Sequence, residues 1–165
     1  MKKYEFTGET KEIRLLFRTA TLHRIRATVA FGIVEVGDLG GWIEKEENLS
    51  HEGKAWVCGD AEVWGNAEVC GDAKVWGNAE VFSASHVLVI GAIGSRNDFT
   101  TFYRDKDNEI TVKCGCFLGK IDRFLEKVTQ THGDSKYALV YRAAVEVAKL
   151  QIDLSGEAPK DADEE

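Results

Sequence analysis

The residues best suited to chemistry lie in one short polar segment, residues 95–104, with the sequence SRNDFTTFYR. Its two arginines, Arg96 and Arg104, can each bind a phosphate through a bidentate guanidinium contact. Strand alternation would place Thr101 and Tyr103 on one face, where hydroxyl and aromatic groups complete a nucleotide site. With three residues further along the chain, the predicted ligand-binding set is Ser95, Arg96, Asn97, Phe99, Thr101, Tyr103, Arg104, Lys113, Cys116 and His132.

Two other kinds of chemistry have weaker support in the sequence. His86 is the best-placed candidate for the general base of an acyltransferase. Cys114 and Cys116 alternate along a predicted strand, and with His132 they would offer three zinc donors, although no second cysteine pair accompanies them. We therefore predict no catalytic residue, no metal and no cofactor, with an acyltransferase or a purely structural trimer as the alternatives.

An internal repeat precedes the polar segment and must position it. From residue 53 the chain reads GKAWVC, GDAEVW, GNAEVC, GDAKVW, GNAEVF and SASHVL. A period of six fits neither a 3.6-residue helix nor a simple hairpin. We expect each hexad to form a short strand and a corner, with Val pointing inward, Ala at the crowded turn and Gly supplying the turn conformation.

These hexads resemble the hexapeptide repeats of left-handed parallel β-helices, a scaffold of many acyltransferases in which three hexads make one 18-residue coil. The resemblance implies a mainly β protein: a left-handed parallel β-helix of about three coils with an N-terminal β cap and a C-terminal α+β cap. On such coils Trp64, Trp76 and Phe82 would point outward into water, Trp64 stacking on Phe82. Exposed aromatic patches mark interfaces, so the sequence predicts a homotrimer.

The flanks complete the predicted organisation. Residues 1–34 are expected to form the β cap, 35–94 the β-helix, 95–154 the α+β cap and 155–165 a flexible acidic tail. Within the α+β cap we expect a hairpin turning at 105–108 and two helices, the first ending at Gly133.

Composition and charge exclude several classes of protein. The 165 residues are 44% hydrophobic and 30% charged, without an apolar stretch long enough for a membrane helix or a signal peptide. Four cysteines without a secretory signal indicate free thiols and a cytoplasmic protein. Residues 35–94 carry a net charge of −8, which would repel duplex nucleic acid.

Several segments together resemble a family of uncharacterised phage and prophage hexapeptide-repeat proteins. They are LHRIRA, GDLGGWIEKEENLS, the hexads, GSRNDFTTFYR, KCGCF and THGD, and the resemblance spans roughly residues 3–152. It implies a viral protein in the host cytoplasm. With the polar cluster and the absence of a catalytic base, this predicts a non-enzymatic sponge. It would sequester a small phosphorylated or cyclic-nucleotide immune signal and so counteract host antiviral defence.

Overall fold

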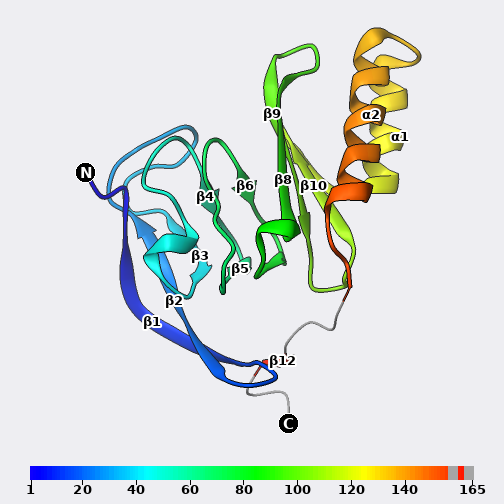
Figure 1. Ribbon diagram of the computed structural model, residues 1–165. Coiled ribbons are helices and arrows are strands. Elements are labelled where there is room, and N and C mark those ends of the chain that lie inside the picture. The colour runs from blue at the N-terminus through cyan, green and yellow to red at the C-terminus, as the bar shows by residue number, and fades with distance from the viewer. Residues whose placement is uncertain (156–159, 162–165) are drawn as a thin grey trace.

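The computed structural model describes residues 1–155 and 160–161, which form three sheets and two helices (Figure 1). The largest sheet has the order β12-β1-β2-β3-β5-β7, and its strands are β1 (Tyr4–Arg14), β2 (Thr19–Ala27), β3 (Leu39–Ile43), β5 (Glu62–Val63), β7 (Glu80–Val81) and β12 (Lys160–Asp161). A two-stranded parallel sheet pairs β4 (Trp56–Val57) with β6 (Lys74–Val75).

The third sheet is antiparallel and carries both helices. Its order is β11-β10-β9-β8, and its strands are β8 (Val87–Ile93), β9 (Asp98–Arg104), β10 (Ile110–Cys114) and β11 (Phe117–Lys120). The helices α1 (Ile121–His132) and α2 (Lys136–Gln151) cover one face of this sheet (Figure 1). Two short 3-10 helices, Glu46–Asn48 and Ala84–His86, lie in the connections.

The repeat behaves locally as its residue types require. The hexad valines from Val57 to Val81 are fully buried, and the alanines from Ala55 to Ala79 are at most 2% exposed. The corner glycines from Gly53 to Gly77 all have φ between 63° and 69°, a left-handed conformation that other residues adopt only with strain. The inward valine and the glycine corner predicted from the sequence are therefore confirmed.

The predicted fold class, a left-handed parallel β-helix with two caps, is wrong as a description of the whole molecule. Parallel pairing does join residues 18 apart, as in Glu62 with Glu80 and Trp56 with Lys74. However, these parallel strands are only two residues long, and β3 joins them to the antiparallel strands β1 and β2. The repeat thus contributes short strands to a mixed sheet, because the long N-terminal hairpin extends the same hydrogen-bonded ladder.

Of the aromatic residues that motivated a homotrimer, Trp64 is buried within the chain, and Trp76 and Phe82 are half-buried. Trp64 does stack on Phe82, with ring centroids 4.8 Å apart, but Trp64 is only 2% exposed because Ile13 and Leu22 of the N-terminal hairpin pack over it. Trp76 lies beneath the ammonium of Lys113, 4.5 Å from the ring centroid. The homotrimer stays a prediction, but it is no longer supported by a fully exposed aromatic patch.

The segment after residue 95 has the expected hairpin and helices, with one difference. β9 and β10 pair around the 105–109 turn, and α1 ends at Gly133. The segment EITVKCGCF, however, is not one strand. β10 ends at Cys114, Gly115 and Cys116 form a turn, and β11 begins at Phe117. The chain reverses there because Gly115 has φ 55°. The predicted tail, 155–165, lies mostly outside the described residues, and Lys160–Asp161 pairs with β1.

The glycine corners give a matched test of the stacking. A Cβ added at Gly53 would lie 2.5 Å from the carbonyl oxygen of Gly71, whereas one at Gly71 would meet nothing within 4 Å. Both positions have the same left-handed φ, so Gly71→Ala should cost only the conformational strain, about 1–2 kcal/mol. Gly53→Ala should cost more, since the clash adds to that strain. Equal melting temperatures for the two variants would contradict this stacking.

Stability should also fall in mild acid because His86 is held neutral. The ring is buried, and its Nδ1 accepts a hydrogen bond from the backbone N–H of Phe82. Burial and, secondarily, the nearby Arg104 charge lower the pKa of His86 below its usual 6.5. The unfolded chain then binds more protons, so the free energy of unfolding falls as pH drops below about 6.5.

Chemical denaturation between pH 7.5 and 5.5 measures this change. In His86→Asn the amide oxygen can accept the same N–H without titrating, so this variant should lose less stability on acidification than the wild-type protein. An identical loss would show that other groups cause it.

Candidate functional site

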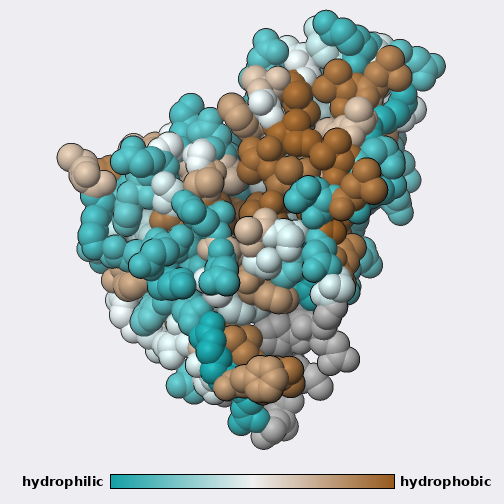
Figure 2. All heavy atoms as spheres, in the orientation of Figure 1, coloured by the Kyte–Doolittle hydropathy of each residue, from teal (hydrophilic) through white to brown (hydrophobic). Residues whose placement is uncertain are grey.

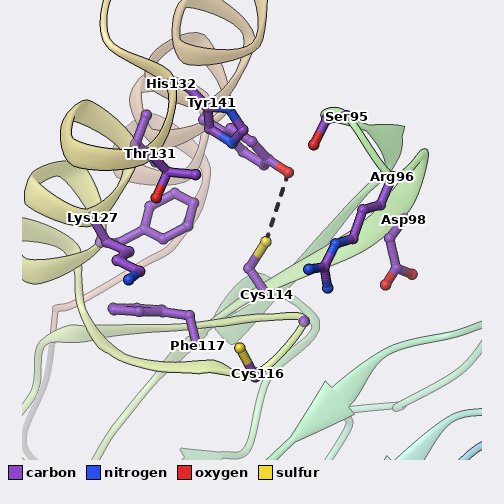
Figure 3. Close-up of a pocket in the computed structure, with 13 residues that line it drawn as sticks. Ser95, Arg96, Asp98, Cys114, Cys116, Phe117, Lys127, Thr131, His132 and Tyr141 are labelled. Atoms are coloured by element: carbon purple, nitrogen blue, oxygen red, sulfur yellow. Dashed lines mark hydrogen bonds between the residues drawn. The ribbon is translucent and has the colours of Figure 1, made fainter.

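One pocket lies where the α helices meet the ends of the antiparallel sheet, with a volume of about 180 Å³ (Figure 3). Three segments supply most of its wall: the β8–β9 turn, the β10–β11 turn and one face of α1. The lining residues are Ser95, Arg96, Asp98, Cys114, Gly115, Cys116, Phe117, Phe124, Lys127, Val128, Thr131, His132 and Tyr141.

Local sequence explains why these segments converge. The β8–β9 turn contains Gly94 and Asn97 with φ of 77° and 48°, and the N–H of Asn97 donates to the Gly94 carbonyl at 3.3 Å. This reversal places Arg96 at the open end of the sheet. On α1, Phe124 and Val128 pack into the core. Lys127 follows Phe124 by three residues and Thr131 follows Val128 by three, so both lie on the neighbouring strip of the helix, which lines the pocket.

The pocket combines cationic and aromatic groups. Arg96 and Lys127 approach it from opposite sides, and the ring of Phe117 lies along its lower wall in the view of Figure 3. The ring of His132 stacks on Tyr141 with centroids 5.8 Å apart. One carboxylate, that of Asp98, also lines the pocket beside Arg96. Such a site can bind an anion and hold a planar ring at the same time.

Tyr141 is anchored rather than activated. Its hydroxyl lies 4.0 Å from the Cys114 sulfur, which accepts a hydrogen bond from Thr100 at 3.3 Å (Figure 3). Burial, and then the neighbouring Cys114, raise the pKa of Tyr141 to about 12. Tyr141 therefore stays protonated near neutral pH and can donate a hydrogen bond, but it is a poor base or nucleophile.

Four of the ten predicted ligand-binding residues line this pocket: Ser95, Arg96, Cys116 and His132. Two more lie nearby without lining it. Asn97 sits in the β8–β9 turn, and the Phe99 ring packs closely over Gly91, where an added Cβ would lie 2.5 Å from it. Six of the ten residues thus lie in or near the pocket, and their ligand-binding role stays a prediction.

The other four predicted residues do not line this pocket, and their assignment to a ligand site stays a prediction. Three of them, Thr101, Tyr103 and Lys113, lie on the sheet face opposite the helices. Thr101 accepts the N–H of Lys74 at 3.1 Å, and the Tyr103 hydroxyl donates to the Trp76 carbonyl at 2.8 Å. Lys113 covers the Trp76 ring. Thr101 and Tyr103 do share a face, as alternation predicted, but that face is buried against the hexads, where it joins the two halves of the molecule.

Arg104 lies outside the pocket. Its side chain is fully buried, its Nε donates to Asn108 at 2.7 Å, and its guanidinium lies 4.9 Å from the centroid of the Phe82 ring. Burial lowers the pKa of this guanidinium. Arg104 thus reaches no ligand in the pocket and acts as a structural cation over an aromatic ring.

The residues of the two alternative chemistries are not arranged for them. His86, the candidate acyltransferase base, is buried against Phe82 and lies outside the pocket. Among residues 1–155 and 160–161, no three His, Cys, Asp or Glu side chains are grouped to hold a metal ion. Cys114 points toward Tyr141, while Cys116 sits in the β10–β11 turn, because the turn at Gly115 breaks the alternation assumed for them (Figure 3).

Several lining residues were not predicted. Lys127 and Thr131 add polar groups, while Phe117, Phe124 and Tyr141 add the aromatic wall. The helical spacing of residues 124, 127, 128 and 131 was the available signal, since it places two polar residues beside the apolar face of α1.

No protein-family model matches this chain, and no curated protein has a matching sequence. The resemblance to phage hexapeptide-repeat proteins therefore stays a prediction. None of the helices in the described part of the chain is long and apolar enough to cross a membrane.

Thiol reactivity provides a direct check of the pocket. All four cysteines are free; Cys70 and Cys116 are exposed, whereas burial raises the pKa of the half-buried Cys58. Because the thiolate is the reactive form, iodoacetamide at pH 7.5 should label Cys70 and Cys116 well before Cys58. Peptide mass spectrometry over time measures this order. Slow labelling of Cys116 would contradict an open pocket at the β10–β11 turn.

Proposed function

We propose that this protein binds a small phosphorylated, nucleotide-derived ligand in the pocket between α1 and the two turns, and holds it without chemical change. The observation that carries the proposal is the placement of Arg96 and Lys127 across the pocket from each other, with aromatic rings between them. The cations would bind phosphate oxygens, and the Phe117 or Tyr141 ring would contact a base.

The dimensions of the pocket limit how much of a ligand it takes. Sites for drug-sized ligands usually measure about 300–1,000 Å³, and this pocket has about 180 Å³. One phosphate and one base would fill it, and the rest of a larger molecule would extend outside. The protonated Tyr141 and the Thr131 hydroxyl are suited to hydrogen bonding with such a fragment.

Binding without turnover is favoured by the chemistry of the lining. Among the described residues, Asp98 alone lines the pocket with a carboxylate and stands beside Arg96, and the phenol of Tyr141 is held protonated. We further propose that the protein acts by sequestration, as a phage-type sponge that withdraws a phosphorylated immune signal in the host cytoplasm. This step rests on the sequence resemblance and on the binding pocket together.

Isothermal titration calorimetry against cyclic dinucleotides, cyclic trinucleotides and cyclic ADP-ribose isomers tests the proposal. With a ligand that binds, Arg96→Ala should weaken the affinity about 10- to 100-fold, since a charged hydrogen bond contributes roughly 1.5–3 kcal/mol. Asp98→Asn should instead strengthen binding by removing a repulsive carboxylate. The matched control is Arg123→Ala, which removes the same charge from an exposed position of α1 outside the pocket.

Cysteine alkylation with and without the ligand can show where the ligand binds. A bound ligand should slow alkylation of Cys116, which lines the pocket, and leave Cys70 unaffected as an internal reference. No heat with any member of the panel, or recovery of a chemically altered ligand from the denatured complex, would reject the proposal. Equal weakening by Arg96→Ala and Arg123→Ala would reject this pocket as the site.

A further inference from the structure

Helix α2 has two apolar faces, and the described residues bury only one of them. Its inner face, including Tyr141, Val145 and Ala148, is buried against the antiparallel sheet. On the opposite side, four apolar residues recur at helical spacing and are exposed to solvent: Leu139, Ala143, Val147 and Leu150. We call these four residues the outer stripe.

The outer stripe is large for a free helix surface. Leu139 is 60% exposed, Val147 is 48% exposed and Leu150 is 89% exposed. A surface helix normally presents charged and polar residues opposite its buried face, and a helix that is apolar on both sides is normally covered on both. The stripe therefore fits an interaction surface better than a solvated one.

The strand beside α2 extends this apolar surface. β8 has the sequence VLVIGAI, without a charge, and in the described part of the chain it is the last strand of its sheet, paired only with β9. Exposed sheet edges usually carry charges that prevent association. Figure 2 shows apolar residues gathered over α2 and the neighbouring ends of β8 and β9, forming one continuous patch.

The occupant that fits this patch is a second copy of the chain, because the stripe is complementary to itself. In an antiparallel pair of α2 helices centred on Ala143, Leu139 faces the partner's Val147, and the small alanine lets the two helices approach closely. Leu150 then faces the partner's Lys136, whose aliphatic stem can cover it. A two-fold axis requires such reciprocal contacts.

Charge supports the same arrangement. Arg142 and Glu146 lie on one flank of the stripe, and an antiparallel pair brings this flank against its own copy. Arg142 is already held by α1, donating to Thr129 and to the Gly133 carbonyl at 3.2 and 3.0 Å, and Glu146 pairs with Lys149 at 3.5 Å. The flank therefore brings opposite charges near each other without requiring a new side-chain bond. Stable dimers bury roughly 800 Å² per partner, more than one helix face offers, and the adjoining β8 edge widens the contact.

We propose that the outer stripe of α2, with the edge of β8, is the surface through which two copies of this protein form a two-fold dimer. The pocket lies on the other side of α2, next to Tyr141, so it stays open in the dimer. The proposal therefore does not depend on the proposed ligand.

Light scattering coupled to gel filtration at micromolar concentration tests the dimer. The wild-type protein should have a mass of about 37 kDa, twice the 18.3 kDa of one chain. Leu150→Lys should raise the dimer dissociation constant at least tenfold, because the new ammonium group would face the partner's Lys136. The matched control is Leu16→Lys in the β1–β2 turn, since Leu16 is 87% exposed and far from the stripe.

A second variant tests the antiparallel register itself. Leu150→Glu removes the same apolar contact but places a carboxylate opposite the partner's Lys136, so it should dimerise more strongly than Leu150→Lys. A wild-type monomer or trimer, a mass unchanged by Leu150→Lys, or equal effects of the Leu150→Lys and Leu16→Lys variants would each overturn the proposal. Both leucines are exposed, so circular dichroism should show unchanged folding in every variant.

Discussion

The stacking of equivalent residues 18 positions apart, held by backbone hydrogen bonds that span 17 positions, is the constraint on which the rest of the structure depends. The N–H of Lys54 donates to the Gly71 carbonyl at 3.0 Å, that of Trp56 to Ala73, and that of Trp64 to Val81 at 3.0 Å. These bonds require every corner to turn identically, which the left-handed glycines allow. Tyr103 of β9 then packs into the core of the stacked hexads and donates to the Trp76 carbonyl at 2.8 Å, which attaches the antiparallel sheet to them.

The sequence allowed the local geometry of the repeat to be predicted, but not its place in the molecule. The buried position of Val57, the crowded position of Ala55 and the left-handed corner at Gly53 could be predicted because each residue type has one favourable place in a six-residue repeat. The mixed sheet could not be predicted, since nothing in the hexads indicates that β1 and β2 continue the same ladder. The same hairpin buries Trp64. The residues around Trp64 in the sequence do not indicate that a distant hairpin packs over it.

The candidate site divides in the same way. Ser95 and Arg96 line the pocket, and the sequence could place them together because a polar turn at the end of a strand is a local feature. Arg104 was assigned to the ligand because an arginine in a polar segment looks available, yet its burial over Phe82 depends on residues 22 positions earlier in the chain. Cys116 and His132 reach the pocket only through the turn at Gly115 and the angle at which α1 crosses the sheet.

The separation of the hexad core from the core beneath the helices has a consequence for how such a protein can change over evolutionary time. The hexads close around one core, and the pocket is built on another, formed by the antiparallel sheet and the helices. Duplication or deletion of a complete 18-residue unit in the upstream hexads would alter the length of the molecule while preserving the surface that receives Tyr103. The architecture thus permits relatives of different lengths to share one unaltered module of antiparallel sheet and helices.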